Sequence, residues 1–288
     1  MWLPWNYAVV LAALCVALWA MLRTGDGGRQ RVVRGLARET ALILVLYAIW
    51  QFAGGVSVMQ ATGADHRGRR IVEIQRAWHL PSEVSLQHLI LPHPLLVQFA
   101  NGYYAIAHVP ALLVFLIWAF LHDRHRYARW RTVLAMTTGA CLAVQLIPVA
   151  PPRMLTDLGF VDTALLYQQS VYSALGRGMA GQLAAMPSVH VAWAVIVALG
   201  TWSIATGAGR WVGVIHALAT ILVVSATANH YWADGMVAVA LIGVSMLVYR
   251  AATTLTLTSS WWPWWPFRTP QWTSTDRDTA RRWIRRSS

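Results

Sequence analysis

The sequence contains no lysine, two cysteines, and charged side chains at 12% of its positions. All 23 basic side chains are therefore arginine. Both cysteines, Cys15 and Cys141, lie in apolar segments, which indicates buried free thiols and excludes a disulfide framework or a cysteine metal site. The scarcity of charge also excludes a soluble domain, because no polar block is long enough to build one.

Hydrophobic residues, in contrast, make up 57% of the 288 positions. Apolar runs close to bilayer length predict an all-α integral membrane protein. The first run lacks a basic segment before it and a clear cleavage site before Arg23, so we interpret it as a retained span and not a signal peptide. We predict seven spans, at residues 5–22, 40–58, 95–121, 132–149, 189–206, 211–228 and 231–249.

These spans suggest three parts: an N-terminal span with a basic loop (1–39), a six-span domain (40–250), and a tail rich in tryptophan and arginine (251–288). Alternate loops then place 17 arginines on one side and 6 on the other. The positive-inside rule predicts a multi-pass cell-membrane protein with its N-terminus outside and its C-terminus in the cytoplasm.

The tail combines an aromatic belt (261–267) with a basic run (280–286), which predicts contact with the inner leaflet. The +12 charge therefore indicates membrane lipids and not nucleic acid.

Two long segments are predicted on the outer side. In the first, Ile71, Ile74 and Trp78 share one helical face, and Ser82 is a natural N-cap for a second short helix. These helices either lie on the outer surface of the membrane or pack as an ordinary connection. The second segment, residues 151–187, has a length typical of lids, binding loops or disordered connections.

A polar stretch, residues 229–234, interrupts a hydrophobic run and contains His230 and Asp234. Such side chains beside the bilayer core cost several kcal/mol unless they are paired or hydrated. Their four-residue spacing places both on one face of a helix, so Asp234 can accept the imidazole N–H of His230. The pair is either functional or a polar contact that holds helices together.

The parity of the spans brings three pieces of the chain to the same outer face. Ser188 is a natural N-cap that turns the positive end of the fifth span outward, toward an anion. His190, in the first turn, can donate a proton to a leaving oxygen, and Arg153 offers a fork suited to phosphoryl oxygens. His230, oriented by Asp234, is then a nucleophile able to form a phosphohistidine without a metal or cofactor.

At these residues the sequence resembles the type-2 phosphatidic acid phosphatase superfamily of membrane phosphatases and phosphotransferases. Residues 185–190, Ala-Met-Pro-Ser-Val-His, match its P-S-x-H motif, and residues 230–234 match the H-x-x-x-D end of its third motif. The resemblance covers residues 40–249 and implies a six-helix transmembrane core with one additional N-terminal span. It also implies His230 as nucleophile, Asp234 as its orienting carboxylate, His190 as general acid and Ser188 as a phosphate ligand.

The sequence departs from the phosphatase branch at three positions. Val224 and Leu146 stand where that branch has an arginine and a lysine, and Met154 replaces the proline after the arginine of its first motif. In this respect the sequence is more similar to the branch that contains inositol phosphorylceramide synthase and sphingomyelin synthase. That resemblance implies transfer of an inositol phosphate or a similar headgroup.

Several further residues are candidates with a second interpretation. Tyr104 and His108 lie on one face of the third span and can reach the site, although His108 can equally be a core histidine bonded between helices. Asn229 can order the backbone beside His230, and Ser188 can be a helix cap alone. Arg153 and Arg177 can bind phosphate, but they can also contact headgroups or form loop salt bridges. Three outer histidines are too scattered to predict a metal site: His79, His88 and His93.

We therefore expect an enzyme that transfers a phosphoryl-containing group from a lipid phosphate or phospholipid at the outer face. The acceptor is either water or an alcohol. Two alternatives are a polyprenyl-phosphate-dependent glycosyltransferase, for which Asp65 would be catalytic, and a transporter with a His–Asp relay. A scaffolding protein is the remaining possibility. The apolar lining does not identify the lipid.

Overall fold

The computed structural model describes residues 4–24, 27–57, 62–169 and 182–258. Within these ranges the chain is helical, and the extended pairing is limited to one parallel bridge between Val149 and Ala184. This confirms the predicted helical class. The chain separates into two compact units, whose boundary falls between Ala53 and Gly54. Arg177, the aromatic belt (261–267) and the basic run (280–286) lie outside the described residues.

The N-terminal unit contains α1 (Trp5–Met21) and most of α2 (Gly28–Ser57). The rings of Trp5 and Phe52 meet edge to face, with their centroids 5.9 Å apart. The helix at the second predicted span begins earlier than expected, because the arginine-rich segment predicted as a loop is helical from Gly28 onward. Arginine is a good helix former, so this segment extends the helix instead of breaking it.

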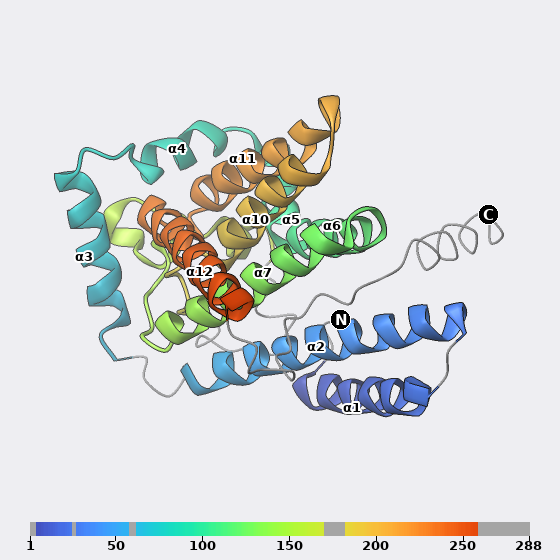
Figure 1. Cartoon of the computed structure of the whole chain (residues 1–288). Helices are drawn as coiled ribbons and strands as arrows, with labels where there is room; N and C mark the ends of the chain where they lie inside the picture. The colour runs from blue at the N-terminus through green and yellow to red at the C-terminus, as the bar shows by residue number, and fades with distance from the viewer. Residues whose placement is uncertain (1–3, 25–26, 58–61, 170–181, 259–288) are drawn as a thin grey trace. The chain divides into compact units, whose positions relative to one another are not determined.

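The second unit is built around α10, which packs against α6, α7, α11 and α12 (Figure 1). Helices α3 and α4 lie outside this group and contact α12 and α11 respectively (Figure 1). The α-helices that lie wholly within the described residues of this unit are α3 (Ala64–Ala77), α4 (Glu83–Ile90), α5 (Pro94–Ile106), α6 (His108–His122), α7 (Arg124–Gln145), α8 (Thr163–Leu166), α10 (Val189–Ile204), α11 (Arg210–Ala226) and α12 (Trp232–Thr258).

Two stretches of helix are long and apolar enough to cross a bilayer, Gly207–Ala226 and Trp232–Leu255. A third is present if the bent pair α5 and α6 forms one span, and α1 and α10 are apolar but shorter. The apolar helices found among the described residues therefore support an integral membrane protein. The total of seven spans, the division at residue 39 and the orientation stay predictions.

The predicted third span is bent by 47° between α5 and α6. The bend has a local cause at Pro110, which lacks the N–H that would bond to the carbonyl of Ile106, and whose ring crowds that carbonyl. Helix α6 therefore starts afresh at His108.

The two predicted outer helices are present as α3 and α4. The Oγ of Ser82 accepts a hydrogen bond from the Ser85 N–H, so Ser82 is the N-cap of α4 as expected. On the face predicted for α3, Ile71 is buried against the protein, whereas Ile74 and Trp78 are exposed. Close packing turns the face of Ile71 toward the protein.

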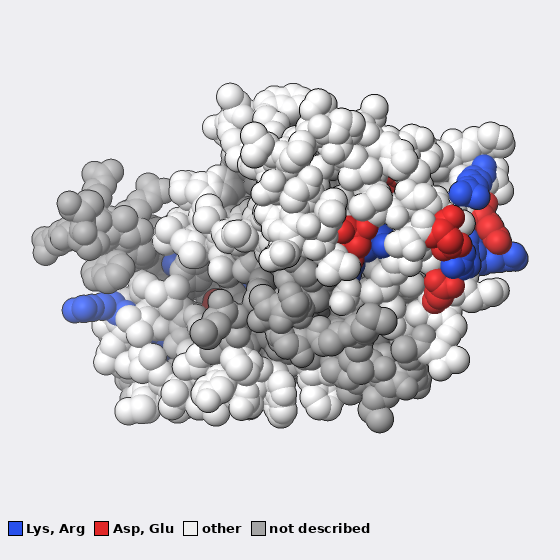
Figure 2. Space-filling view, turned by 180° about the vertical axis from the view of Figure 1, so that it is seen from behind, with Lys and Arg blue, Asp and Glu red and all other residues white. Residues whose placement is uncertain are grey.

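Charged side chains gather at one edge of the second unit, and the rest of the visible described surface carries few of them (Figure 2). Three ion pairs contribute side chains of α3: Arg69 with Asp65 at 2.7 Å, Arg69 with Asp157 at 2.6 Å, and Arg70 with Glu73 at 3.3 Å. The outer surface of α3 is therefore hydrated, while its opposite face packs on the protein.

Candidate active site

The turn between α11 and α12 presents His230. Helix α11 ends at Ala226, and the N–H groups of Asn229 and His230 both donate to the Val224 carbonyl. Ala228, which is fully buried, adopts a left-handed conformation with a φ of 52° and reverses the chain. This compact turn places His230 just before the first turn of α12.

Asp234 lies in that first turn and is fully buried. Its Oδ2 accepts a hydrogen bond from the Tyr231 N–H at 2.9 Å, which satisfies one of the free amides at the start of α12. The same oxygen lies 3.3 Å from Nδ1 of His230. The carboxylate thus sits at the positive end of a helix and beside the imidazole.

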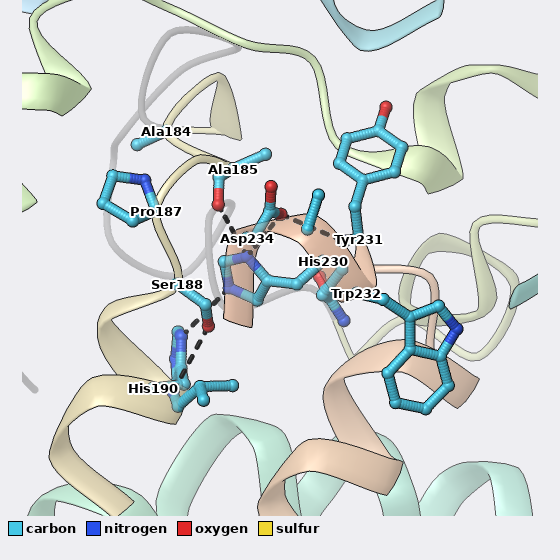
Figure 3. Close-up of polar contacts among 12 residues, drawn as sticks. Ala184, Ala185, Pro187, Ser188, His190, His230, Tyr231, Trp232 and Asp234 are labelled. Atoms are coloured by element: carbon cyan, nitrogen blue, oxygen red, sulfur yellow. Dashed lines mark hydrogen bonds and ion pairs between the residues drawn. The ribbon is translucent and has the colours of Figure 1, made fainter. Parts of the chain in front are cut away.

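The ring of His230 has a defined orientation (Figure 3). Its Nδ1 donates to the Ala185 carbonyl at 2.8 Å, a partner that the sequence motifs do not reveal. A carbonyl oxygen accepts but cannot donate, so Nδ1 carries the proton in the neutral ring. The lone pair is therefore on Nε2, the nitrogen that faces away from Asp234.

His190 faces that lone pair. Its Nδ1 lies 3.2 Å from Nε2 of His230 (Figure 3), so Nδ1 of His190 is the donor in this contact. Helix α10 begins beside it at Val189, capped by Ser188, whose Oγ accepts from the Val191 N–H at 3.3 Å. The Ser188 N–H donates to the Asp234 carbonyl at 3.3 Å. The structure thus brings the two sequence motifs into direct contact.

Two side chains from the bent pair α5 and α6 lie against the histidines. The ring centroid of Tyr104 is 4.5 Å from that of His190 and 6.4 Å from that of His230. The His108 ring meets His190 edge to face at 4.2 Å. Both candidates from the third predicted span therefore lie against His190.

Arg153 is buried, with 2% of its surface exposed, and all three of its guanidinium nitrogens have protein partners. Its Nη1 donates to Asn229 Oδ1 at 2.8 Å and its Nη2 to Gln182 Oε1 at 3.0 Å. Its Nε lies 3.3 Å from Asp162 Oδ2. The arginine thus forms the loop salt bridge that was one of its predicted alternatives. It also bonds to Asn229, the residue that precedes His230.

Asn229 orders the turn from the other side. Its Nδ2 donates to Thr227 Oγ1 at 2.8 Å, while its Oδ1 receives the hydrogen bond from Arg153. The Arg153 backbone N–H also donates to the Ala228 carbonyl at 2.8 Å. The segment after α7 is therefore tied to the turn that carries His230, which agrees with the ordering role expected of Asn229.

Two further residues that the motifs do not identify contact the start of α12. Glu83 Oε1 accepts from the Trp232 N–H at 3.0 Å, and Gln75 Oε1 accepts from the Ala233 N–H at 2.8 Å. One signal was available in the sequence: Tyr231 is a poor N-cap, so the free amides of α12 require acceptors from elsewhere. Which side chains supply them depends on the tertiary fold.

The described residues contain no group of three or more histidine, cysteine, aspartate or glutamate side chains that could hold a metal ion. Of the three scattered outer histidines, His88 has its Nε2 3.2 Å from the Gly159 carbonyl. This histidine therefore has a protein partner in the segment that follows α7.

In this helical membrane protein, two histidines and one carboxylate thus form a cluster at the ends of α10, α11 and α12, in which His230 and Asp234 are buried. The chain belongs to the PAP2 superfamily, whose sequence profile matches residues 69–248, more than half of its length. This confirms the superfamily predicted from the two motifs, and it supports a membrane enzyme of the phosphatase or phosphotransferase type with a lipid phosphate substrate. Searches of curated proteins and of solved structures found no match.

Proposed function

We propose that this protein is a membrane-embedded lipid phosphotransferase or lipid-phosphate phosphatase that works through a phosphohistidine on His230. The observation that carries the proposal is the contact of 3.2 Å between His230 Nε2 and His190 Nδ1, with His230 Nδ1 bonded to the Ala185 carbonyl. This arrangement puts the lone pair of His230 on Nε2, the nitrogen that attacks, and places the proton donor His190 beside it.

The reaction proceeds in two steps. In the first, the lone pair on His230 Nε2 attacks phosphorus while the bond from phosphorus to the leaving oxygen breaks. His190, protonated on both nitrogens when the anionic substrate is bound, gives one proton to that oxygen, and an alcohol departs. In the second step, water or an acceptor alcohol attacks phosphorus, His190 takes its proton, and the nitrogen–phosphorus bond breaks.

Positive charge near the phosphoryl group comes from two sources in this proposal. The start of α10 points its free amides and positive dipole end at the site, beside Ser188. Arg153 contributes a fixed cation next to Asn229. Asp234 balances the charge that develops on the His230 ring, and Tyr104 contacts the substrate from α5.

We further propose an alcohol acceptor, such as an inositol-containing headgroup, and an active site at the outer face of the cell membrane. Val224, which replaces an arginine of the phosphatase branch, is buried in an apolar cluster with Tyr104 and Val191. The wall of the site therefore has no cation at that position. A site with fewer cations resembles the transferase branch more than the phosphatase branch.

Asp65 distinguishes this proposal from a polyprenyl-phosphate glycosyltransferase. Its carboxylate forms a surface ion pair with Arg69 at 2.7 Å, and 60% of its side-chain surface is exposed. An exposed and paired carboxylate is poorly suited to act as a catalytic base.

The test is turnover of phosphorus-labelled lipids by the purified protein in detergent or vesicles. His230→Ala and His190→Ala should each lose turnover by at least about a hundredfold. Asp65→Asn should keep wild-type turnover. Wild-type turnover by either histidine variant would contradict the mechanism, and loss of activity in Asp65→Asn alone would support the glycosyltransferase.

A further inference from the structure

The first turn of α12 receives its hydrogen-bond acceptors from a distant part of the chain. A helix start leaves free N–H groups, and the residue before α12 is Tyr231, whose side chain cannot cap them in the usual way. The Trp232 N–H donates to Glu83 Oε1 at 3.0 Å, and the Ala233 N–H donates to Gln75 Oε1 at 2.8 Å. The Tyr231 N–H donates to Asp234 Oδ2 at 2.9 Å.

Glu83 and Gln75 also bind each other. The Nε2 of Gln75 donates to the same Glu83 Oε1 at 2.8 Å, and each residue is only 4% exposed. Gln75 comes from the last turns of α3, and Glu83 is the first residue of α4. A buried carboxylate is tolerated here because two N–H donors and the positive end of α12 compensate for its lost hydration.

We propose that Gln75 and Glu83 form a clamp that positions His230 and Asp234 for catalysis, an inference that rests on the proposed function. The clamped amides of Trp232 and Ala233 directly precede Asp234, and the same turn fixes the 3.3 Å contact between Asp234 Oδ2 and His230 Nδ1. If the first turn of α12 rotated, Asp234 would move away from the imidazole. Neither clamp residue forms a hydrogen bond or ion pair with His190 or His230, so both act through α12.

A second contact supports the same docking. The Tyr231 hydroxyl donates to the Ala150 carbonyl at 2.8 Å, and Gly68 of α3 lets that hydroxyl approach closely. Helix α3 therefore approaches the chain at two points between His230 and Asp234: at Tyr231 through Gly68, and at Ala233 through Gln75. The two outer helices thus form a support for the catalytic turn and are not only a surface-bound connection.

The experiment compares Glu83→Ala, Glu83→Gln and Gln75→Ala with the wild type, using kcat, KM and the folded fraction of each. Ser82→Ala is the matched control, because it removes the cap of α4 without touching α12. We expect Glu83→Ala to lower kcat by about tenfold or more, as loss of groups that orient a catalytic side chain usually does, with little change in KM. Glu83→Gln retains an acceptor oxygen for the Trp232 N–H and should recover most of kcat. Ser82→Ala should keep wild-type kcat per folded molecule.

A double variant separates positioning from a purely structural role. If the clamp acts through Asp234, then Glu83→Ala should have little further effect on kcat in an Asp234→Asn background. If the two substitutions in the double variant lower kcat by the product of their separate effects, the clamp proposal is wrong. Wild-type kcat in both Glu83→Ala and Gln75→Ala would also overturn it. If Glu83→Ala does not fold, Gln75→Ala provides the same comparison with Asp234→Asn. An active His230→Ala would instead overturn the proposed function itself.

Discussion

At the scale of single residues, two acceptors share the task of orienting His230. The Ala185 carbonyl is nearer to Nδ1, at 2.8 Å, than Asp234 Oδ2 is, at 3.3 Å. The carbonyl therefore sets the tautomer, whereas the carboxylate supplies the negative charge that balances a cationic ring. Because of this division of roles, replacing Asp234 should lower kcat less than replacing the nucleophile His230.

The first prediction concerns Asp234→Asn. The variant should lower kcat by about a hundredfold, because it removes the compensating charge, yet it should retain residual turnover since Ala185 still holds the tautomer. His230→Ala should show no turnover above background. Steady-state assays of both variants check this, and an Asp234→Asn as inactive as His230→Ala would contradict the role given to Ala185.

The second prediction concerns Arg153→Lys. Lysine keeps the charge, but its single nitrogen cannot bridge Asn229, Gln182 and Asp162 together. Arg153→Lys should lower the free energy of unfolding by about 2 kcal/mol, the scale of lost hydrogen bonds to a charged group. Thermal or denaturant unfolding in detergent measures this change, and an unchanged midpoint would show that the bridge contributes little.

At the scale of elements, the packing of α3 against the catalytic turn has little free space. A Cβ at Gly68 would lie 2.7 Å from the Tyr231 hydroxyl oxygen and 2.8 Å from the Ala150 carbonyl oxygen. Both distances are too short for a carbon atom, so a side chain at this position must push α3 outward. Glycine here permits a close approach and is not merely tolerated.

The third prediction is that Gly68→Ala destabilises the protein by about 1–3 kcal/mol, the usual cost of overpacking. Gly102→Ala in α5 is the matched control, because a Cβ there has no atom within 4 Å. The control should be neutral or stabilising by up to about 1 kcal/mol, since alanine is the better helix former. Equal midpoints for the two variants in thermal unfolding would contradict the packing described for α3.

The fourth prediction concerns pH and the link between α3 and the turn Thr156–Leu158. The guanidinium of Arg69 donates to both oxygens of Asp157, at 2.6 and 3.0 Å, and lowers the pKa of that carboxyl. The stabilisation is fully present above the unfolded pKa of aspartate, about 3.9, and is lost as the pH falls through the lower folded value. Both side chains are partly exposed, so the effect should be small and weakened by salt.

Unfolding midpoints of the wild type and Asp157→Asn should differ slightly near neutral pH and converge as the pH falls below about 4. Asp65→Asn, which removes the other partner of Arg69, serves as a comparison at the same edge of α3. A difference that grows in acid would have the wrong sign for this contact.

The sequence predicts some of these elements much better than others. Hydrophobic periodicity indicates the helices, and local capping chemistry identifies the start of α4 at Ser82, because both depend on neighbours in the chain. The bend before His108 was missed, although Pro110 was visible, since apolar runs do not report helix direction. The pattern of α3 also leaves its environment open, because helical periodicity does not say which residues the rest of the protein covers.

The same distinction applies to the site. The motifs identify His190, His230 and Asp234, because their spacing and the parity of the predicted spans place them at one face. The structure brings these three residues together. The contacts of Gln75, Glu83 and Ala185 connect positions far apart in the chain. Such contacts depend on how the helices dock, and no local pattern in one sequence encodes them.

At the scale of the whole molecule, orientation in the membrane decides which leaflet supplies the substrate. The fifth prediction uses a cysteine-free variant in which both native cysteines, Cys15 and Cys141, are replaced. Trp78→Cys should react with a membrane-impermeant thiol reagent in intact cells, whereas His125→Cys should react only after permeabilisation. Both positions are exposed in the structure. The reverse pattern would contradict the positive-inside assignment.

The most direct test of the central claim is to trap the phosphoenzyme. Purified protein is mixed with phosphorus-labelled lipid phosphate, quenched in alkali, digested and mapped, because a phosphohistidine survives alkali and is lost in acid. We predict label on the peptide that contains His230, absent in His230→Ala and released either to water with time or to an added acceptor alcohol. Turnover that proceeds without label on His230, or with acid-stable label on another residue, would contradict the mechanism.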